Sequence, residues 1–122
     1  MRNQPGYSLF KNARYAVEGF FEVVAHETSF RIEVILSLLV WIGLLFVEMP
    51  LVAKAALGLS MLGVLIAELA NSAIERVVDL VTQEHHPLAK HAKDAGATMV
   101  LFTVLFTAVV WLVTLYLVYF SD

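Results

Sequence analysis

Three long apolar segments, at 30–48, 51–81 and 87–120, constrain the fold of this chain more than any other feature. A transmembrane helix needs about 20 mainly apolar residues to cross a hydrocarbon core of about 30 Å. The chain has 122 residues, of which 60% are hydrophobic, and its mean hydropathy is +0.78. Such a composition is too apolar for a soluble domain of this size. The sequence therefore predicts an all-α membrane protein, built as one membrane-embedded domain over 1–122 with three transmembrane helices.

The segment at 7–28 precedes the first span and predicts an amphipathic helix. Its apolar residues recur at steps of three and four, as one face of a helix requires. They are Phe10, Ala13, Val17, Phe20, Phe21 and Val24, and they alternate with Lys11, Arg14, Glu18 and Glu22. Because membrane spans follow directly, we expect this helix to lie on the surface, in the membrane interface. An ordinary helix packed in a soluble domain is the alternative interpretation.

The distribution of Lys and Arg predicts the orientation of the chain in the membrane. Basic residues lie before the first span and between the second and third, whereas only Lys54 lies on the other side. By the positive-inside rule, the N-terminus and the second loop are cytoplasmic. Residues 1–6 have no apolar stretch, so we expect no cleaved signal peptide. The absence of cysteine excludes thiolate chemistry, and a net charge of -3 gives no support for nucleic-acid binding.

The second span carries a polar stripe near its end. Glu68, Asn71, Glu75 and Asp79 follow at spacings of three, four and four, so they lie within roughly a quarter of the helix circumference. Glu68 lies about 26 Å along the helix from Leu51, just inside a hydrocarbon core of about 30 Å. Glu75 and Asp79 lie about 36 and 42 Å along, in the headgroup region and the water. The stripe therefore suits a reaction between a lipid headgroup and a soluble reagent.

A polar seam between packed helices is the structural alternative for this stripe. In that interpretation, Arg31, Lys90 or Lys93 would neutralise the acids. A seam that only holds helices together would be better built from Ser, Thr and Asn, which carry no cost of ionisation. The carboxylates therefore favour a functional site.

Glu27, at the start of the first span, is expected at the same level as Glu75. Two carboxylates that meet there can hold Mg²⁺, which commonly binds one or two carboxylates together with phosphates and water. An i,i+4 ion pair between Glu27 and Arg31 is the alternative, and both arrangements can hold at once. Glu33 is either another polar site residue or an interfacial acid.

Basic and histidine residues gather around the loop between the second and third spans. Lys93 can bind phosphate as a point charge, or it can snorkel to the interface as a positive-inside lysine. The adjacent His85 and His86 are interpreted as solvated residues rather than metal ligands. Neither a G-x-x-x-x-G-K-[ST] loop nor the protein-kinase motifs occur, so a phosphotransferase here would need a different fold.

Two motifs resemble those of a known family. The pattern E-x-x-N-S-A-I-E-x-x-V-D runs over 68–79, and A-K-D-A-G runs over 92–96. In a chain of this size and hydropathy, they resemble the prokaryotic integral-membrane diacylglycerol kinase family, which includes undecaprenol kinases. The resemblance covers nearly the whole chain, including Glu27 and the Phe30-Arg31 pair. It implies a homotrimer in the bacterial cytoplasmic (inner) membrane, active sites shared between subunits, and Mg²⁺ and ATP as reagents.

The resemblance also implies roles for individual residues. The family's proposed general base is matched by Glu68, and its ligands for metal and ATP are matched by Glu27 and Glu75. The family's contacts to ATP fall at Tyr15, Glu84, His85, His86, Lys93 and Asp94. The path of the lipid substrate falls along Arg31, Glu33, Glu68 and Trp111, and the remaining polar residues of the first motif are Asn71 and Asp79.

Two positions depart from the pattern of the family. Ser8 stands where members carry an Arg that contacts ATP, and Ala97 stands where they carry a Ser after the Lys-Asp pair. The sequences at 78–82 and 86–90 are somewhat more similar to the undecaprenol kinase branch. The choice of lipid therefore stays open.

The resulting prediction is an ATP:diacylglycerol phosphotransferase that makes phosphatidic acid. Glu68 would accept the proton of the lipid hydroxyl, and Mg²⁺ on Glu27 and Glu75 would neutralise charge during in-line transfer of the γ-phosphoryl group. The same reaction on undecaprenol is the first alternative. A small proton- or cation-coupled transporter, in which Glu68 would be the coupling acid, is the second.

Overall fold

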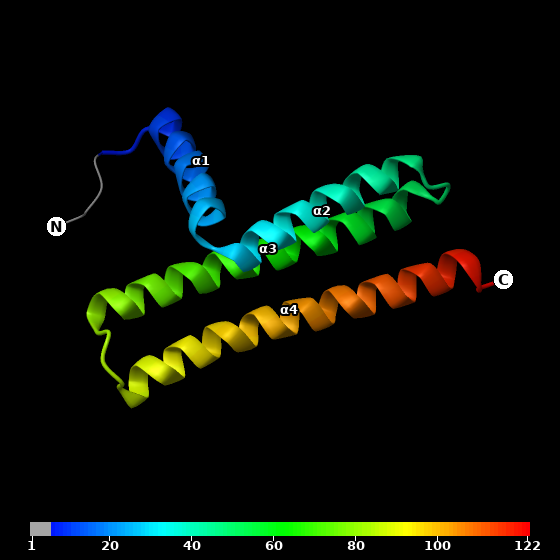
Figure 1. Ribbon diagram of the computed structural model, residues 1–122. Coiled ribbons are helices and arrows are strands. Elements are labelled where there is room, and N and C mark those ends of the chain that lie inside the picture. The colour runs from blue at the N-terminus through cyan, green and yellow to red at the C-terminus, as the bar shows by residue number, and fades with distance from the viewer. Residues whose placement is uncertain (1–5) are drawn as a thin grey trace.

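A computed structural model describes residues 6–122, and this part of the chain forms four α-helices (Figure 1). They are α1 (Leu9–His26), α2 (Thr28–Phe46), α3 (Leu51–Val81) and α4 (Pro87–Tyr119). Helices α2, α3 and α4 are each long and apolar enough to cross a membrane. The predicted all-α class with three helices of membrane-spanning character is therefore confirmed. The position of α1 in the membrane interface and the homotrimer stay predictions.

Local sequence explains where two of the helices begin. The Oγ atom of Ser8 accepts a hydrogen bond from the N–H of Lys11 at 3.5 Å, so Ser8 caps α1. Pro87 is the first residue of α4, where a missing N–H leaves no helical hydrogen bond unmade. The Nδ1 atom of His86 accepts a hydrogen bond from the N–H of Leu88 at 3.1 Å and caps the same helix.

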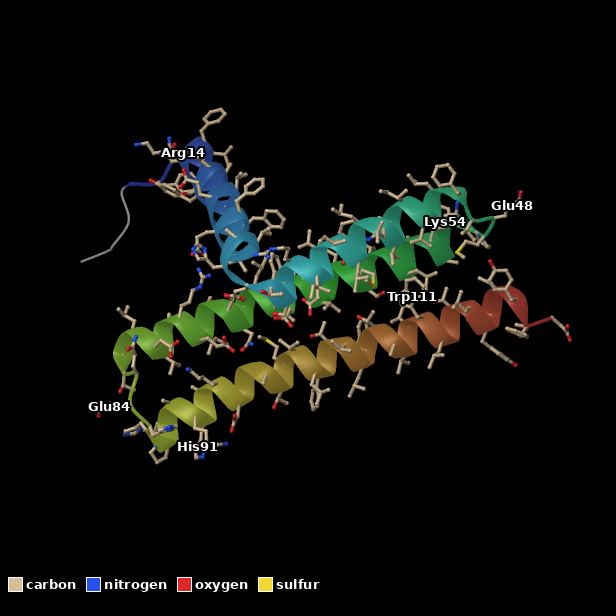
Figure 2. All side chains as sticks on the ribbon, in the orientation of Figure 1. Arg14, Glu48, Lys54, Glu84, His91 and Trp111 are labelled. Atoms are coloured by element: carbon tan, nitrogen blue, oxygen red, sulfur yellow. The ribbon has the colours of Figure 1, made fainter. Side chains whose placement is uncertain are left out.

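Helix α3 is the central element of the bundle. It lies antiparallel to α4 along most of its length, and α2 packs against its first half (Figure 1). Helix α1 leaves the bundle at a steep angle and contacts α2. Glu84 and His91 mark the end with the α3–α4 loop, called the loop end below, and Glu48 and Lys54 mark the opposite end (Figure 2). The polar stripe predicted on α3 therefore leads toward the loop end.

The buried core lies where α1, α2 and α3 meet. Val23, Phe30 and Leu65 are buried and form its centre. The ring of Phe20 packs edge-on against that of Phe30, with the two centroids 5.8 Å apart. Aromatic pairs of this kind stabilise a contact beyond the area they bury. The core therefore fixes α1 to the start of α2, close to the position of Glu27.

Neutral polar side chains join the helices in the middle of the bundle, and we call them the neutral cluster. The Nε1 atom of Trp41 on α2 donates to the carbonyl of Gly58 on α3 at 3.0 Å. On α4, Oγ1 of Thr107 donates to the carbonyl of Ser60 at 3.0 Å, and Nε1 of Trp111 donates to Oγ of Ser60 at 3.1 Å. Each of these donors has a partner within the chain, as an apolar environment requires.

Most large apolar side chains of α2 and α4 point away from the rest of the chain. Leu45 and Phe46 on α2 are 76% and 82% exposed, and Leu112 on α4 is 70% exposed. Large exposed apolar faces on a single chain mark surfaces that lipid or another protein covers. The faces of these helices therefore suit a membrane environment.

Candidate functional site

A pair of carboxyl groups lies inside the bundle, between α2 and α3. Glu68 is half-buried on α3, and its carboxyl group neighbours that of Glu33 on α2. The Oε2 atom of Glu33 is buried and has no hydrogen-bond partner within residues 6–122. Two ionised carboxylates side by side repel each other, so a proton shared between them would stabilise the pair. The pair therefore offers an acceptor for a proton inside the apolar part of the molecule.

Asn71, one turn beyond Glu68, lies in the contact between α3 and α4. Its Nδ2 atom donates to Oε1 of Glu75 at 3.2 Å. Its Oδ1 atom is buried and has no partner in the part of the chain that the structure describes. A Cβ atom at Gly96 would collide with this oxygen, so any other residue here would require the Asn71 side chain to move. The glycine that ends A-K-D-A-G therefore has a packing role.

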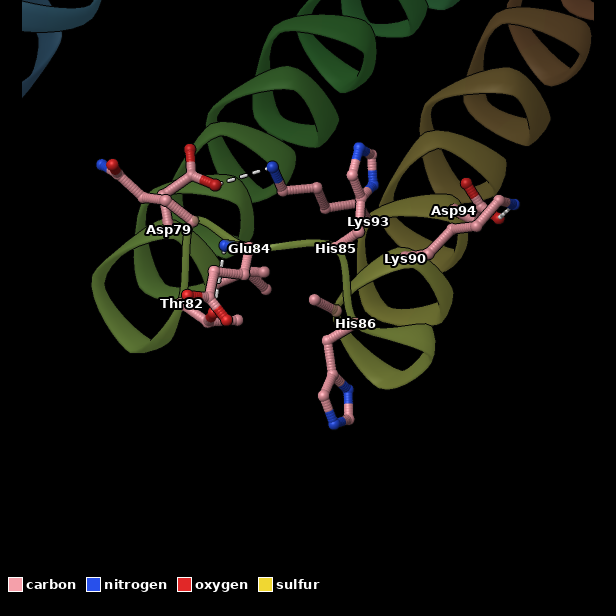
Figure 3. Close-up of a pocket in the computed structure, with 11 residues that line it drawn as sticks. Asp79, Thr82, Glu84, His85, His86, Lys90, Lys93 and Asp94 are labelled. Atoms are coloured by element: carbon pink, nitrogen blue, oxygen red, sulfur yellow. Dashed lines mark hydrogen bonds and ion pairs between the residues drawn. The ribbon is translucent and has the colours of Figure 1, made fainter.

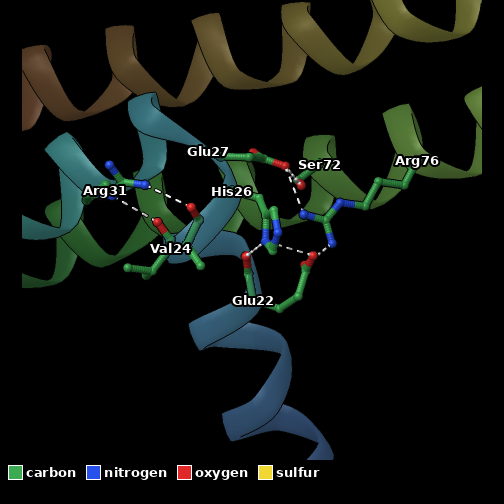
Figure 4. Close-up of polar contacts among 8 residues, drawn as sticks. Glu22, Val24, His26, Glu27, Arg31, Ser72 and Arg76 are labelled. Carbon is green, nitrogen blue, oxygen red and sulfur yellow. Dashed lines mark hydrogen bonds and ion pairs between the residues drawn. The ribbon is translucent and has the colours of Figure 1, made fainter.

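Four side chains link the α1–α2 junction to α3, and we call them the junction network (Figure 4): Glu22, Glu27, Ser72 and Arg76. The Oε1 atom of Glu27 accepts hydrogen bonds from Oγ of Ser72 and from Nη2 of Arg76, the latter at 3.3 Å. The Nη1 atom of Arg76 donates to Oε2 of Glu22 on α1. One guanidinium thus holds two carboxylates from two sides of the α1–α2 junction.

Arg31 makes a different contact from the ion pair with Glu27 that the sequence left open. Its Nε and Nη2 atoms donate to the carbonyls of Val24 and Ala25 at 3.0 and 2.9 Å, in the last turn of α1 (Figure 4). Such carbonyls lack partners within their own helix. Glu27 pairs with Arg76 instead, because its backbone is extended, with φ -121° and ψ 111°, and it stands between two helices. An i,i+4 pair requires both residues within one helix.

Glu27 and Glu75 each keep a carboxylate oxygen that can coordinate a hard cation. Glu75 is exposed, and Asn71 occupies only its Oε1 atom. Ser72 and Arg76 both bond to Oε1 of Glu27. The second oxygen of each carboxylate has no hydrogen-bond partner within residues 6–122, so the chemistry of the pair fits Mg²⁺.

The structure does not by itself form a complete metal site from these residues. In the described part of the chain, no group of three or more His, Cys, Asp and Glu side chains could hold a metal ion. Glu27 contacts Ser72 and Arg76, whereas Glu75 contacts Asn71. The two carboxylates therefore hold separate partners in the single chain, and a cation would need further ligands such as phosphate or water.

A pocket of about 390 Å³ opens at the loop end between α3 and α4 (Figure 3). Five of the residues expected around ATP line it: Glu84, His85, His86, Lys93 and Asp94. Asp79, the last acid of the polar stripe, also lines it. The two imidazoles point in different directions (Figure 3), and Nδ1 of His86 is occupied as the cap of α4. The pocket therefore brings Lys93 and Asp94 of the A-K-D-A-G motif close to Asp79, the last residue of the motif on α3.

Ion pairs set the charge of this pocket. The Nζ atom of Lys93 lies 2.7 Å from Oδ1 of Asp79, across the α3–α4 contact. The Nζ atom of Lys90 lies 2.5 Å from Oδ2 of Asp94, one turn along α4. All four side chains stay between two fifths and three quarters exposed, so water screens both pairs. A phosphate group that enters the pocket could replace the carboxylate partners of the Lys90 and Lys93 ammonium groups.

The remaining predicted residues lie apart from this pocket. Tyr15 is on the exposed surface of α1. Trp111 belongs to the neutral cluster, with its indole N–H bonded to Ser60. Of the two positions that depart from the family pattern, Ser8 caps α1 and Ala97 is exposed on α4.

Sequence reasoning missed the partners of Glu27. Ser72 and Arg76 stand one turn apart on α3, and both reach Glu27. The available signal was their i,i+4 spacing inside the first motif, beside the stripe of acids. Thr82 in the pocket was missed as well, and Lys90 was expected only as a residue that could neutralise the acids of the stripe.

The fold and the site define a small helical membrane protein whose acids run from inside the bundle to a pocket at its end. A family profile described as prokaryotic diacylglycerol kinase matches residues 14–115 of this chain. The chain belongs to this family.

Curated relatives agree with that assignment over most of their length. The diacylglycerol kinase of Escherichia coli K12 is 31% identical over 115 residues, which cover 93% of this chain and 94% of the relative. That of Helicobacter pylori J99 is 36% identical over 111 residues, covering 88% and 87%. The undecaprenol kinase of Bacillus subtilis 168 is 38% identical over 89 residues, covering 73% and 72%. These relatives and the three apolar helices support a lipid kinase in a bacterial membrane.

Proposed function

We propose that this protein transfers the γ-phosphoryl group of ATP to the hydroxyl group of diacylglycerol and releases phosphatidic acid and ADP. The observation that carries the proposal is the continuous series of polar side chains from the Glu33–Glu68 pair, inside the bundle, to the pocket at the loop end. The lipid hydroxyl would bind near the Glu33–Glu68 pair, and the soluble nucleotide would bind in the pocket. Membership of the diacylglycerol kinase family supports the same reaction.

Glu68 is the proposed general base. The hydroxyl oxygen of the lipid attacks the γ-phosphorus, the bond from that phosphorus to the bridging oxygen breaks, and ADP carries away the bond's electrons. The hydroxyl proton passes to Glu68, which is half-buried at the depth expected for a lipid headgroup. Glu33 lies beside it in the proposed lipid site. Arg31 and Trp111 stay proposed neighbours of the lipid.

Glu27 and Glu75 are the proposed ligands of Mg²⁺, which would neutralise charge on the phosphates when bound. Ser72 holds the Glu27 carboxylate, and Asn71 holds that of Glu75. Lys93 and Asp94, with Glu84, His85 and His86 from the loop, would position the nucleotide. Tyr15 would have to reach ATP from α1, outside the pocket.

We further propose a homotrimer with shared sites in the bacterial inner membrane, with the loop end in the cytoplasm. The exposed apolar faces of α2 and α4 support association of the chains. Mixing inactive Glu68→Gln with inactive Lys93→Met should restore part of the activity in mixed trimers. A monodisperse, active monomer in mild detergent would contradict this assembly.

Undecaprenol is the second candidate substrate, because an undecaprenol kinase is among the relatives. The deciding experiment offers γ-labelled ATP with diacylglycerol and undecaprenol side by side to purified protein in detergent. We expect labelled phosphatidic acid to be the main product. Preferential labelling of undecaprenol would assign the chain to the second reaction. ATP-dependent transfer without any ion gradient would also exclude a coupled transporter.

A further inference from the structure

In the junction network, one guanidinium group binds two carboxylates. Arg76 donates to Glu22 on α1 and to Glu27 at the start of α2 (Figure 4). The side chains of Arg76 and Glu22 are 44% and 46% exposed, whereas that of Glu27 is 26% exposed. The positive charge is therefore divided between an outer acid and an inner one.

Ser72 and Arg76 act on Glu27 in different ways. Ser72 is 2% exposed, so its hydroxyl group is a fixed donor that orients the carboxylate. Arg76 is a long, half-exposed side chain whose guanidinium carries a full charge. Both donate to Oε1 of Glu27, which leaves Oε2 of this carboxylate for another partner. Ser72 therefore fixes the orientation of the Glu27 carboxylate. Arg76 places a positive charge beside the carboxylate to which a metal ion would bind.

We propose that Arg76 is a positioning residue that lowers the affinity of Glu27 for Mg²⁺, and that Glu22 raises this affinity by drawing the guanidinium toward α1. The inference rests on the proposed function, in which Glu27 binds the metal. A guanidinium 3.3 Å from Oε1 of Glu27 repels a divalent cation on the same carboxylate. Glu22 competes for that guanidinium, so the docking of α1 becomes linked to metal affinity.

A purely structural role for the network makes a different prediction. If Arg76 only fastened α1 to α3, loss of either Arg76 or Glu22 would loosen the same contact. Both substitutions would then change stability in the same direction and would leave metal affinity unchanged. The signs of the changes in metal affinity therefore separate the two interpretations.

The test measures Mn²⁺ binding to the purified full chain by electron paramagnetic resonance, with a non-hydrolysable ATP analogue and no lipid. Mn²⁺ is a paramagnetic substitute for Mg²⁺ that also prefers carboxylate and water ligands. Arg76→Gln should lower the apparent Kd about two- to fivefold, the range that half-exposed ion pairs allow. Glu22→Gln should raise it about twofold, and the double variant should match Arg76→Gln.

Glu18→Gln is the matched control, because Glu18 is an exposed acid of α1 that pairs with Arg14 outside the network. It should leave Mn²⁺ affinity unchanged. Shifts in the same direction for Arg76→Gln and Glu22→Gln, or no shift in either, would overturn the inference. Glu27→Gln separates this failure from that of the proposed function. If Glu27→Gln also keeps wild-type affinity, then the metal assignment itself is wrong. If Arg76→Gln does not fold, Glu22→Gln and Glu18→Gln still decide the sign.

Discussion

Polar side chains join the helices in two regions of this molecule, and the two regions use different chemistry. In the neutral cluster, indole and hydroxyl groups donate to the backbone of Gly58 and Ser60 or to the Ser60 hydroxyl. In the junction network and at the loop end, carboxylates meet Arg76 and Lys93. Neutral groups carry no ionisation cost in an apolar environment, whereas charges need water or a counter-ion.

The two regions differ in the hydrogen-bonding capacity that they leave unused. Each donor of the neutral cluster is satisfied within the chain, so that region fixes the helices to one another. Among residues 6–122, one carboxylate oxygen each on Glu27 and Glu75 and a buried oxygen on Glu33 have no hydrogen-bond partner. Buried polar atoms without a partner call for an explanation, such as a catalytic role, a bound ion or a water molecule.

The largest effect is expected at Glu68. Glu68→Gln removes the proposed proton acceptor but keeps the size of the side chain, so turnover should fall about 10²- to 10⁴-fold, the usual contribution of a general base. The variant should still insert, fold and bind ATP. Steady-state kinetics on purified protein check this, with Glu48→Gln at the opposite end as the control (Figure 2). Turnover near that of wild type would remove the assignment.

The second effect concerns the glycine against Asn71. Gly96→Ala forces a Cβ atom onto Oδ1 of Asn71 and should destabilise the α3–α4 contact by about 1–3 kcal/mol. Gly63→Ala is the matched control, because its Cβ would lie 3.8 Å from Thr103, an ordinary contact. It should stabilise α3 by up to about 1 kcal/mol through helix propensity. Thermal unfolding in detergent measures both, and equal shifts would contradict the close approach at Gly96.

The third effect lies in the neutral cluster. Ser60→Ala removes the acceptor for the indole N–H of Trp111 and should cost about 0.6–1.7 kcal/mol of stability. Because no charge is involved, the loss should not depend on salt. Unfolding measured at low and high ionic strength checks this, with Ser121→Ala as the control. A loss that disappears at high salt would show that charges outside the cluster carry the effect.

The smallest effect is expected for an exposed ion pair. Arg14 and Glu18 lie 3.3 Å apart on α1, and their side chains are 69% and 60% exposed. Glu18→Gln should therefore lower stability by no more than about 0.5 kcal/mol. This loss should vanish as salt is added, which is the opposite of the behaviour expected for Ser60→Ala. A loss above 1 kcal/mol would mean that α1 is held by its surface charges.

The sequence was sufficient for the parts of the molecule that hydrophobic periodicity controls. The three apolar helices follow from composition, and the break near Pro50 follows from the fixed backbone of proline. The acids at Glu68 and Glu75 were found because charges are rare on an apolar helix. Their roles remain predictions.

The partners of these acids could not be read from the sequence. Arg76 reaches Glu22 and Glu27 because the chain breaks at Glu27 and sends α1 across the end of α2. Nothing in the local pattern fixes that angle. In the same way, the contact of Gly96 with Asn71 depends on how closely α4 approaches α3. Tertiary distances of this kind appear only when the helices are assembled.

The most direct test of the account is the product formed from ATP and lipid by purified protein in detergent, where no ion gradient exists. We expect phosphorylated lipid in amounts equal to the ADP released, and loss of both products in Glu68→Gln. ADP release without phosphorylated lipid from either diacylglycerol or undecaprenol would contradict the central claim that the acids inside the bundle and the pocket at the loop end form one phosphotransfer site.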